Sequence, residues 1–198
     1  MTQYITSDWH FGHNNICGKD GFVSTRTHFR STEEMNEYLI ETINSVVTNG
    51  DTLYHLGDFS MNLNPTQAFD IVKKLKGQLV LIKGNHDTTS TLKYFEENNY
   101  KLPDGRDKVI IHEVGYTFKQ DKKRYYMTHY PLLLGGKRKK LRSFCGHIHD
   151  ECAPDNNILN VGIDSPELSQ GHRFGEPLLL EQAIELVELK FRNRKEDV

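Results

Sequence analysis

Metal-binding side chains occur in five short segments of the sequence, each placed where an apolar run ends. The segments are Asp8-Trp-His10, Gly57-Asp58, Gly84-Asn-His-Asp87, His129 and Gly146-His-Ile-His149. Side chains two positions apart in an extended chain point to the same side, so Asp8 and His10 can face one metal ion. His147 and His149 have the same spacing. We therefore expect the five segments to supply one site.

The donor atoms in these segments indicate which metals would bind. Carboxylate oxygens, imidazole nitrogens and the amide oxygen of Asn85 form a hard-to-borderline ligand set, which suits Mn, Fe, Zn or Ni better than Ca or Cu(I). The candidate ligands are Asp8, His10, Asp58, Asn85, His129, His147 and His149. Because this set exceeds what one ion needs, we predict two divalent ions about 3.5–4 Å apart, bridged by a carboxylate. We expect Mn, with Fe, Zn or Ni as alternatives.

Three apolar runs must act as the strands that position the first ligands, namely residues 2–7, 52–57 and 78–83. Helical patterns lie between and after them, over residues 31–47, 65–75 and, more briefly, 91–97. Ser31 with Glu34 predicts a capping box, and Pro65 and Gly77 mark the start and end of the second helix. This β-α-β-α-β order predicts parallel strands with helices packed on the sheet, where sites form beyond the carboxyl ends of the strands.

The second half of the chain has a different pattern. Short apolar segments at 109–112, 116–118 and 124–128 are separated by glycine or charged turns, which predicts a hairpin-rich, more antiparallel half with a hairpin tip at 119–124. Further strands are expected at 143–145 and 158–163, followed by an amphipathic helix over 180–191 and a charged tail. We find no repeat or dividing linker, so residues 1–198 are predicted to form a single domain.

Composition narrows the class of protein. A net charge of -2 and a pI near 6.5 do not favour binding of the whole surface to a nucleic acid or a membrane. They do not exclude a local basic patch that binds such a partner. No apolar run approaches the roughly 20 residues of a membrane span, and the first residues do not form a signal peptide, so we expect a cytoplasmic protein. No motif indicates a protein partner. Cys145 and Cys152 bracket two histidines, but they lack the C-x-x-C spacing of a zinc knot.

Taken in order, the five segments resemble the calcineurin-like metallophosphoesterases, whose pattern D-x-H, G-D, G-N-H-D/E, H and G-H-x-H is present over residues 8–149. The start Asp8-Trp-His-Phe-Gly-His-Asn-Asn15 is similar to that of small bacterial and phage members that begin D-x-H-F-G-H-x-N. Their late N-V-G-x-D also occurs, as Asn160-Val-Gly-Ile-Asp164. The resemblance implies an α/β fold, a four-layered α-β-β-α sandwich with two mixed sheets.

The resemblance also implies a role for each ligand. Asp58 would bridge the two metals, and the other ligands would divide into Asp8, His10 and His149 at one metal and Asn85, His129 and His147 at the other. A metal-bridging hydroxide would attack phosphorus in line. His86 would donate a proton or hydrogen bond to the leaving oxygen, and Asn85 would also lie against the substrate.

The resemblance favours one substrate class over others. Family members that act as protein phosphatases carry G-D-x-x-D-R-G, whose second aspartate and arginine bind the phosphate; here the run is Gly57-Asp-Phe-Ser-Met-Asn62. His86 as a leaving-group donor suits a phosphodiesterase acting on nucleotide or nucleic-acid phosphoesters. A phosphomonoesterase and a non-catalytic metal-binding scaffold stay open as alternatives.

Several residues near the motifs have two interpretations. Asp87 either orients His86 or caps the following helix, and His13 either contacts substrate phosphate or packs its loop. Arg173, in a segment at 164–175 that is longer than expected for the narrower group, is a candidate phosphate contact.

The basic run Lys137–Arg142 is either a solvated turn or a surface that attracts a polyanion. Tyr125, Tyr126 and Tyr130 either stack bases or fill a sheet face. We assign structural roles to the histidines that carry no motif, which are His28, His55, His112 and His172.

Overall fold

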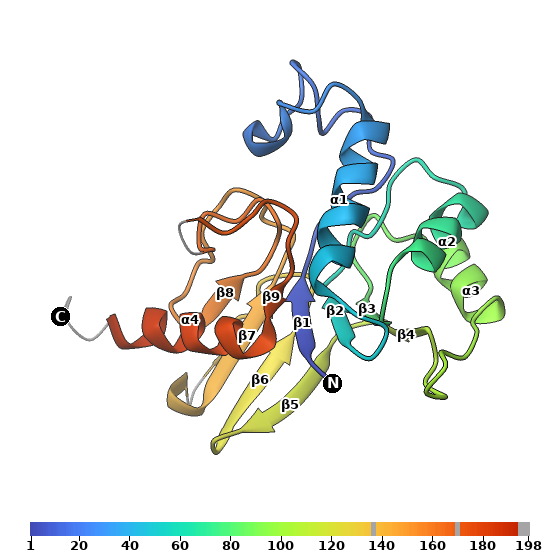
Figure 1. Cartoon of the computed structure of the whole chain (residues 1–198). Coiled ribbons are helices and arrows are strands. Elements are labelled where there is room, and N and C mark those ends of the chain that lie inside the picture. The colour runs from blue at the N-terminus through green and yellow to red at the C-terminus, as the bar shows by residue number, and fades with distance from the viewer. Residues whose placement is uncertain (136–137, 169–170, 194–198) are drawn as a thin grey trace.

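Alternating strands and helices in the first half of the chain build a five-stranded mixed sheet (Figure 1). The computed structural model describes residues 1–135, 138–168 and 171–193. The strand order is β4-β3-β2-β1-β9, with β1 to β4 parallel and β9 antiparallel to β1. The bounds are β1 Gln3–Thr6, β2 Thr52–His55, β3 Gln78–Ile82, β4 Val109–His112 and β9 Leu178–Leu179.

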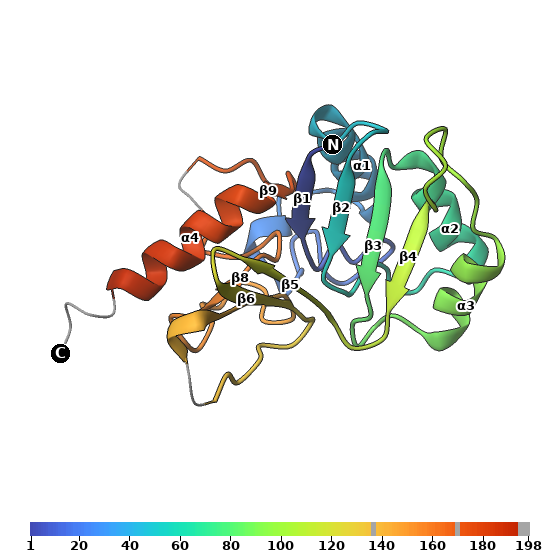
Figure 2. The ribbon, with the colours of Figure 1, turned by 90° about the horizontal axis from the view of Figure 1, so that it is seen from below.

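Three helices cover one face of this sheet, as Figures 1 and 2 show from two directions. They are α1 (Thr32–Val46), α2 (Pro65–Lys74) and α3 (Thr89–Glu97). Ser31 caps α1 as predicted, but the carboxylate of Glu34 accepts the N–H of Arg30 instead of completing the capping box. Asn64 and Gln67 form the full box at the start of α2, with Pro65 in its first turn. Gly77 follows the helix at a φ of 72°.

The second sheet has the order β5-β6-β7-β8, and its strands are β5 (Tyr116–Gln120), β6 (Lys123–Met127), β7 (Leu141–Cys145) and β8 (Ile158–Asn160). The predicted hairpin tip is confirmed, since β5 and β6 pair antiparallel around Asp121 and Lys122. The prediction of a more antiparallel half was otherwise wrong. Strand β4 joins the first sheet, and β6, β7 and β8 pair in parallel. Long connections such as residues 146–157, between β7 and β8, can return the chain to the same end of the sheet, which a tight turn cannot do.

Helix α4 (Leu180–Asn193) helps to close the core between the two sheets. The core residues come from the first sheet (Ile5, Val80, Ile82), the second sheet (Tyr125, Met127, Phe144) and α4 (Leu180, Ala183, Ile184, Val187). The predicted α/β sandwich with two mixed sheets is therefore confirmed. Strand β9 was missed because it is only two residues long, and β8 ends earlier than predicted. None of the helices in the described ranges is long and apolar enough to cross a membrane.

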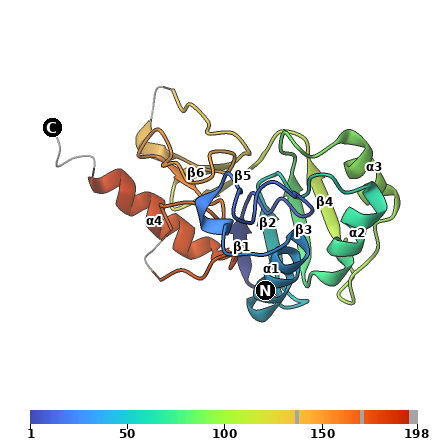
Figure 3. The same cartoon turned by 90° about the horizontal axis from the view of Figure 1, so that it is seen from above.

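The parallel strands bring the predicted ligand segments that follow β1, β2 and β3 to one end of the sheet, beyond the carboxyl ends of the strands, and this end is called the ligand edge. The register of β1, β2 and β3 places the residues after each strand side by side, and Phe11 bridges to Ser60 just beyond the sheet. The segment between β1 and α1 lies above this edge, as the views from the side and from above agree (Figures 1 and 3). It therefore forms a wall beside the candidate ligands.

Candidate metal centre

The structure gathers six of the predicted ligands into two groups whose donor atoms lie within 4.8 Å of one another. One group is Asp8, His10 and His149, and the other is Asp58, His129 and His147. Asp58 lies between the groups, because its Oδ2 is 3.6 Å from Nε2 of His10 and 3.5 Å from Nε2 of His129. Its other oxygen accepts the backbone N–H of His86 at 2.9 Å. This is the position that a bridging carboxylate requires.

The backbone at these ligands is not extended, which corrects the reasoning from two-residue spacing. Five ligands have left-handed φ angles: Asp8 at 61°, His10 at 53°, Asp58 at 57°, His147 at 71° and His149 at 43°. Such angles are uncommon for residues with a Cβ, and strained backbone of this kind clusters at functional sites. Hydrogen bonds from the N–H of Asp8 to Gly57 O (3.1 Å) and from the N–H of His10 to Asp58 O (3.0 Å) hold the first segment in place.

Glycines in the motifs allow the carboxylates to approach the backbone closely. A Cβ at Gly84 would collide with the Oδ1 and backbone nitrogen of Asp58. A Cβ at Gly146 would collide with Ser7 Oγ and the carboxylate of Asp8. Both glycines are therefore required by the position of a ligand, and not by a turn alone.

His129 and Asn85 point two electron-pair donors at each other. A carbonyl can only accept, so His129 donates from Nδ1 to Leu56 O at 2.8 Å. Burial lowers the pKa of His129, which leaves the ring neutral with a lone pair on Nε2. That nitrogen is 2.8 Å from Oδ1 of Asn85. With Oδ1 of Asn85 facing Nε2 of His129, two lone pairs meet, and a cation between them would make this contact favourable. This fits the prediction of Asn85 as a metal ligand.

His10 is buried without a hydrogen-bond partner on either ring nitrogen among the described residues. Burial lowers its pKa, as do Arg26 and the neighbouring histidines, so the ring is neutral. A buried polar atom without a partner typically costs about 1–3 kcal/mol. Coordination of an ion would satisfy one of these nitrogens. The donor set in this structure therefore fits a metal at the first group.

Asp164 orients the ring of His149. Nδ1 of His149 lies 3.3 Å from Oδ2 of Asp164, which holds the ring and leaves the other ring nitrogen free of this contact. Asp164 also accepts from Thr25 and from Nε of Arg26, at 3.0 Å for Arg26. Burial raises the pKa of Asp164, but the charge of Arg26 and the hydrogen bonds outweigh it and hold that pKa well below its usual range. Carboxylates that hold a metal-binding histidine in this way typically change metal affinity 10- to 100-fold when removed.

Two further side chains hold the backbone of the ligand segments, and sequence reasoning assigned neither. Arg26 donates to the carbonyl oxygens of Asp8 at 2.6 Å and Trp9 at 2.9 Å. Asn160 donates to the carbonyl of His149 at 2.9 Å and accepts the N–H of Gly162 at 2.9 Å. The N-V-G-x-D segment signalled Asn160, whereas nothing in the spacing of Arg26 shows that it is buried.

Asp87 holds the backbone around Asp58, so the interpretation of Asp87 as a helix cap was wrong. Its carboxylate accepts the N–H groups of Asp58, Phe59 and Gly84, each at 2.9 Å. Thr88 caps α3 instead. Burial raises the pKa of Asp87 to about 6, against the effect of these hydrogen bonds. Burial likewise raises the pKa of Asp8 to about 7, because a charged carboxylate loses its contact with water at this position.

His13 and His86 lie beside the first ligand group. The ring of His10 is 5.5 Å from that of His13 and 5.4 Å from that of His86. His13 is buried and its Nδ1 has no partner in the described part of the chain, whereas His86 is half-buried. A contact of either histidine with substrate stays a prediction.

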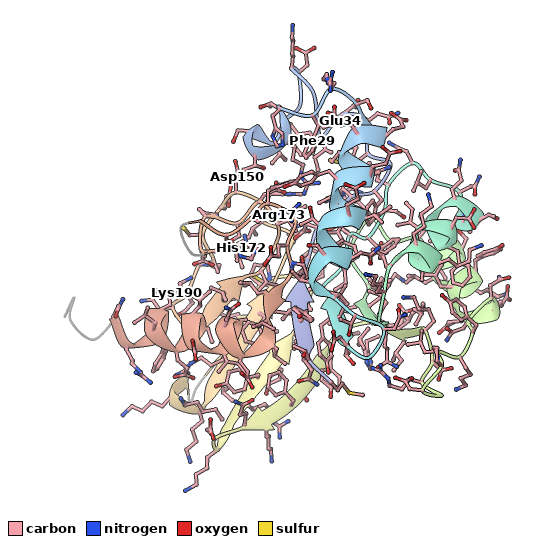
Figure 4. All side chains as sticks on the ribbon, in the orientation of Figure 1. Phe29, Glu34, Asp150, His172, Arg173 and Lys190 are labelled. Atoms are coloured by element: carbon pink, nitrogen blue, oxygen red, sulfur yellow. The ribbon has the colours of Figure 1, made fainter. Side chains whose placement is uncertain are left out.

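The side chain of Arg173 packs against Tyr38 of helix α1, and not against the candidate ligands. Its Nε donates to the hydroxyl of Tyr38 at 3.5 Å, and its guanidinium lies 5.5 Å from the centre of that ring. Figure 4 shows Arg173 next to α1. Its role as a phosphate contact stays a prediction.

Part of the basic run is structural. Arg142 is buried and forms an ion pair with Glu188 of α4 at 3.0 Å, while Lys137 lies outside the described residues. Tyr125 is also buried in the sheet, and its hydroxyl donates to Glu188. Neither Arg142 nor Tyr125 is therefore available to a substrate.

The histidines without a motif have contacts that fit structural roles. His55 lies against Trp9, His28 against Phe29, His112 against Tyr116, and His172 bonds to Glu176 O. Cys145 is buried and Cys152 exposed, and neither belongs to a candidate metal group in the described residues.

Known proteins resemble this chain in sequence and in fold. The sequence model described as calcineurin-like phosphoesterase matches residues 1–189. The uncharacterised protein MJ1445 of Methanocaldococcus jannaschii is 37% identical over 125 residues, which are 60% of this chain and 63% of that protein, so the match spans less than two thirds of its length.

Among solved structures, the chain is similar to a protein of unknown function from Aquifex aeolicus, AQ665, with a TM-score of 0.65, 21% identity and coverage of 93% of this chain and 98% of that one. This likeness shows the fold. YfcE, a phosphoesterase from E. coli, aligns with a TM-score of 0.45 and 16% identity over 87% of this chain and 84% of its own.

Proposed function

The chain belongs to the calcineurin-like phosphoesterase family, and we propose that it is a dinuclear metal-dependent phosphodiesterase acting on nucleotide or nucleic-acid phosphoesters. The observation that carries the proposal is the position of Asp58 between two groups of ligands, 3.6 Å from His10 and 3.5 Å from His129. A site for one ion would need only one of these groups. We expect Mn at both positions, with Fe, Zn or Ni as alternatives.

The family resemblance divides the ligands between two ions, and the two groups of side chains in the structure support this division. Asp8, His10 and His149 would hold one ion, Asn85, His129 and His147 the other, and Asp58 would contact both. Two ions bound there supply a water of lowered pKa as nucleophile and offset negative charge on the phosphoryl oxygens. The chain itself contributes a fixed set of ligands. Asp87 accepts a backbone N–H at Asp58, and Arg26 and Asn160 donate to backbone carbonyls at Asp8 and His149.

His86 and His13 are the groups of this chain that act on the substrate. Each lies beside His10, so each can reach an oxygen of a phosphate held at the first group. We assign His86 the donation of a proton or hydrogen bond to the leaving oxygen, which typically contributes about 10²- to 10⁴-fold. His13 would contact a non-bridging oxygen.

The charge around the site favours a diester over a monoester. A monoester near neutral pH carries more negative charge than a diester and calls for further cationic side chains. In the described residues, the arginine whose hydrogen bonds reach the ligand segments is Arg26, and it is committed to Asp164 and to backbone carbonyls. The arginine of the protein-phosphatase motif G-D-x-x-D-R-G is absent, because Asn62 stands at its position.

The proposal is tested by hydrolysis of bis(p-nitrophenyl) phosphate and p-nitrophenyl phosphate by Mn-loaded protein, with Asp58→Asn in parallel. We expect diester turnover in the wild type and its loss in the variant, together with loss of bound Mn measured by elemental analysis. Preference for the monoester would make the protein a phosphatase. Two bound ions without turnover of either ester would favour a non-catalytic scaffold.

His86→Asn separates leaving-group chemistry from metal binding. We expect it to keep both ions and to lose more activity on diesters with poor leaving groups than on p-nitrophenyl esters, which need little protonation. An equal loss on both would contradict the role of His86.

A further inference from the structure

Two exposed aromatic rings flank the candidate metal centre. Phe22, on the segment between β1 and α1, is 60% exposed, and Tyr130, which directly follows His129, is 53% exposed. Single exposed apolar side chains are common on proteins. These two are distinguished by their position, because each ring contacts histidines of a different ligand group.

Phe22 lies at the first group. Its ring is edge-to-face with that of His149, with centroids 6.2 Å apart and planes at 89°, and it lies 5.4 Å from the ring of His13. The same ring borders a hollow of about 320 Å³ that is also lined by His147 and His149. This volume is at the lower end of the range of about 300–1,000 Å³ for small-molecule sites. An organic group next to the first metal would therefore meet Phe22.

Tyr130 lies at the second group. Its ring is T-shaped against His147, with centroids 4.6 Å apart and planes at 65°, and against His129 at 5.0 Å and 69°. These contacts fix the orientation of the ring while about half of the residue stays exposed. An organic group next to the second metal would therefore meet Tyr130.

We infer that Phe22 and Tyr130 stack on the two organic groups of a phosphodiester whose phosphorus lies between the ligand groups. The substrate class is a single-stranded nucleic acid or dinucleotide with a base on each side of the scissile phosphate. This inference rests on the proposed function and deepens it. A phosphomonoester has one organic group, so it would use only one of the rings.

Stacking on the two rings would not depend on the identity of the bases in the substrate. Every base has a π-face, so an exposed ring binds all bases, and its removal typically weakens binding roughly 5- to 150-fold per base. The net charge of -2 is compatible with this mode, because the metal ions would supply the attraction for phosphate. Tyr130 thus takes the stacking role that the sequence left open, while Tyr125 fills the sheet.

The experiment measures binding and turnover separately. Calorimetry of Mn-loaded protein with phosphorothioate-linked dithymidine reports binding, and hydrolysis of dithymidine monophosphate and of methyl p-nitrophenyl phosphate reports kcat and KM. The variants are Phe22→Leu, Tyr130→Leu and the double variant. Tyr130→Phe keeps the ring, and Tyr100→Leu removes an exposed tyrosine that packs near Phe69, away from the ligands.

We expect each leucine variant to weaken dithymidine binding by roughly 5- to 150-fold and to raise KM, with the two effects multiplying in the double variant. Methyl p-nitrophenyl phosphate, which has one ring, should respond to only one of the two substitutions. Tyr130→Phe and Tyr100→Leu should bind as the wild type does, and all variants should keep their metal.

Two results would overturn the inference. Unchanged binding in the double variant would show that the rings do not contact substrate, and an equal loss on both diesters would show a general effect on the site. If the wild type binds dithymidine phosphorothioate but hydrolyses no diester, the proposed catalysis fails, and the calorimetry of the variants still decides the role of the rings.

Discussion

Replacing Asp164 by asparagine tests how the ring of His149 is held. The substitution keeps the size of the side chain but removes the negative charge beside Arg26, and both side chains of that ion pair are fully buried. Breaking a buried pair by removing one partner typically costs about 3–5 kcal/mol. Arg26 keeps its hydrogen bonds to two carbonyls, so we expect a loss of about 3 kcal/mol in the free energy of unfolding.

The same substitution should weaken metal binding about 10- to 100-fold, because an amide holds the histidine less strongly than a carboxylate. The assays are urea unfolding of metal-free protein and calorimetric titration with Mn. Glu188→Gln is the matched control: it disrupts the buried contact with Arg142 at 3.0 Å, on the side of the molecule formed by α4, and should lower stability without changing metal affinity.

The effect of Asp164→Asn on stability should depend on pH in a defined way. Because the pKa of Asp164 is held below its unfolded value of about 3.9, its contribution is fully present above that pH and is lost as the pH falls toward the folded pKa. The difference between wild type and variant should therefore be constant near neutral pH and shrink below about pH 4. Wild-type metal affinity in the variant would refute the claim that Asp164 orients His149.

Three further predictions concern stability. Asp87→Ala leaves three buried N–H groups without their acceptor, which should lower the free energy of unfolding by about 1–3 kcal/mol for each group and weaken Mn binding. The control Thr88→Ala removes a helix cap, so it should cost about 1 kcal/mol and leave the Mn affinity measured by calorimetry unchanged. Burial lowers the pKa of Lys108 to about 8, so between about pH 8 and pH 10 the unfolded chain binds more protons at this residue than the folded protein does. The free energy of unfolding of the wild type, measured with urea, should therefore rise relative to that of Lys108→Met over this range. Removal of metal with a chelator should lower the melting temperature, since ions at 100 times their Kd stabilise by about 2.7 kcal/mol per site, and the decrease should be smaller in Asp58→Asn.

The clustering of the candidate ligands was predictable because metal chemistry depends on residue type and because strand ends are visible as the ends of apolar runs. Asp58 and His129 follow from both, and the structure brings them together. The direction of β7 and β8 was not predictable, because an alternating pattern is the same for parallel and antiparallel neighbours. Arg26 was missed for a related reason, since its burial depends on a pairing with Asp164, 138 positions away.

Asp87 shows why a local motif can mislead. Its position before α3 satisfies the sequence rule for a helix cap, and Thr88 satisfies it equally. The carboxylate lies inward because it accepts three N–H groups around Asp58, and a charged acceptor for several buried donors outweighs one exposed cap. Such competition depends on tertiary contacts, which the sequence does not display.

The left-handed ligands explain why the site needs these supporting side chains. Five strained residues at about 1 kcal/mol each would cost about 5 kcal/mol, which is comparable with the whole net stability of a small domain. Asp87 accepts from N–H groups at Asp58, Arg26 donates to carbonyls at Asp8, and Asn160 donates to the carbonyl of His149. Each strained segment is thus held through its backbone by a neighbouring side chain. Because these hydrogen bonds need no metal ion, we expect metal-free protein to keep its fold and to bind its ions without refolding.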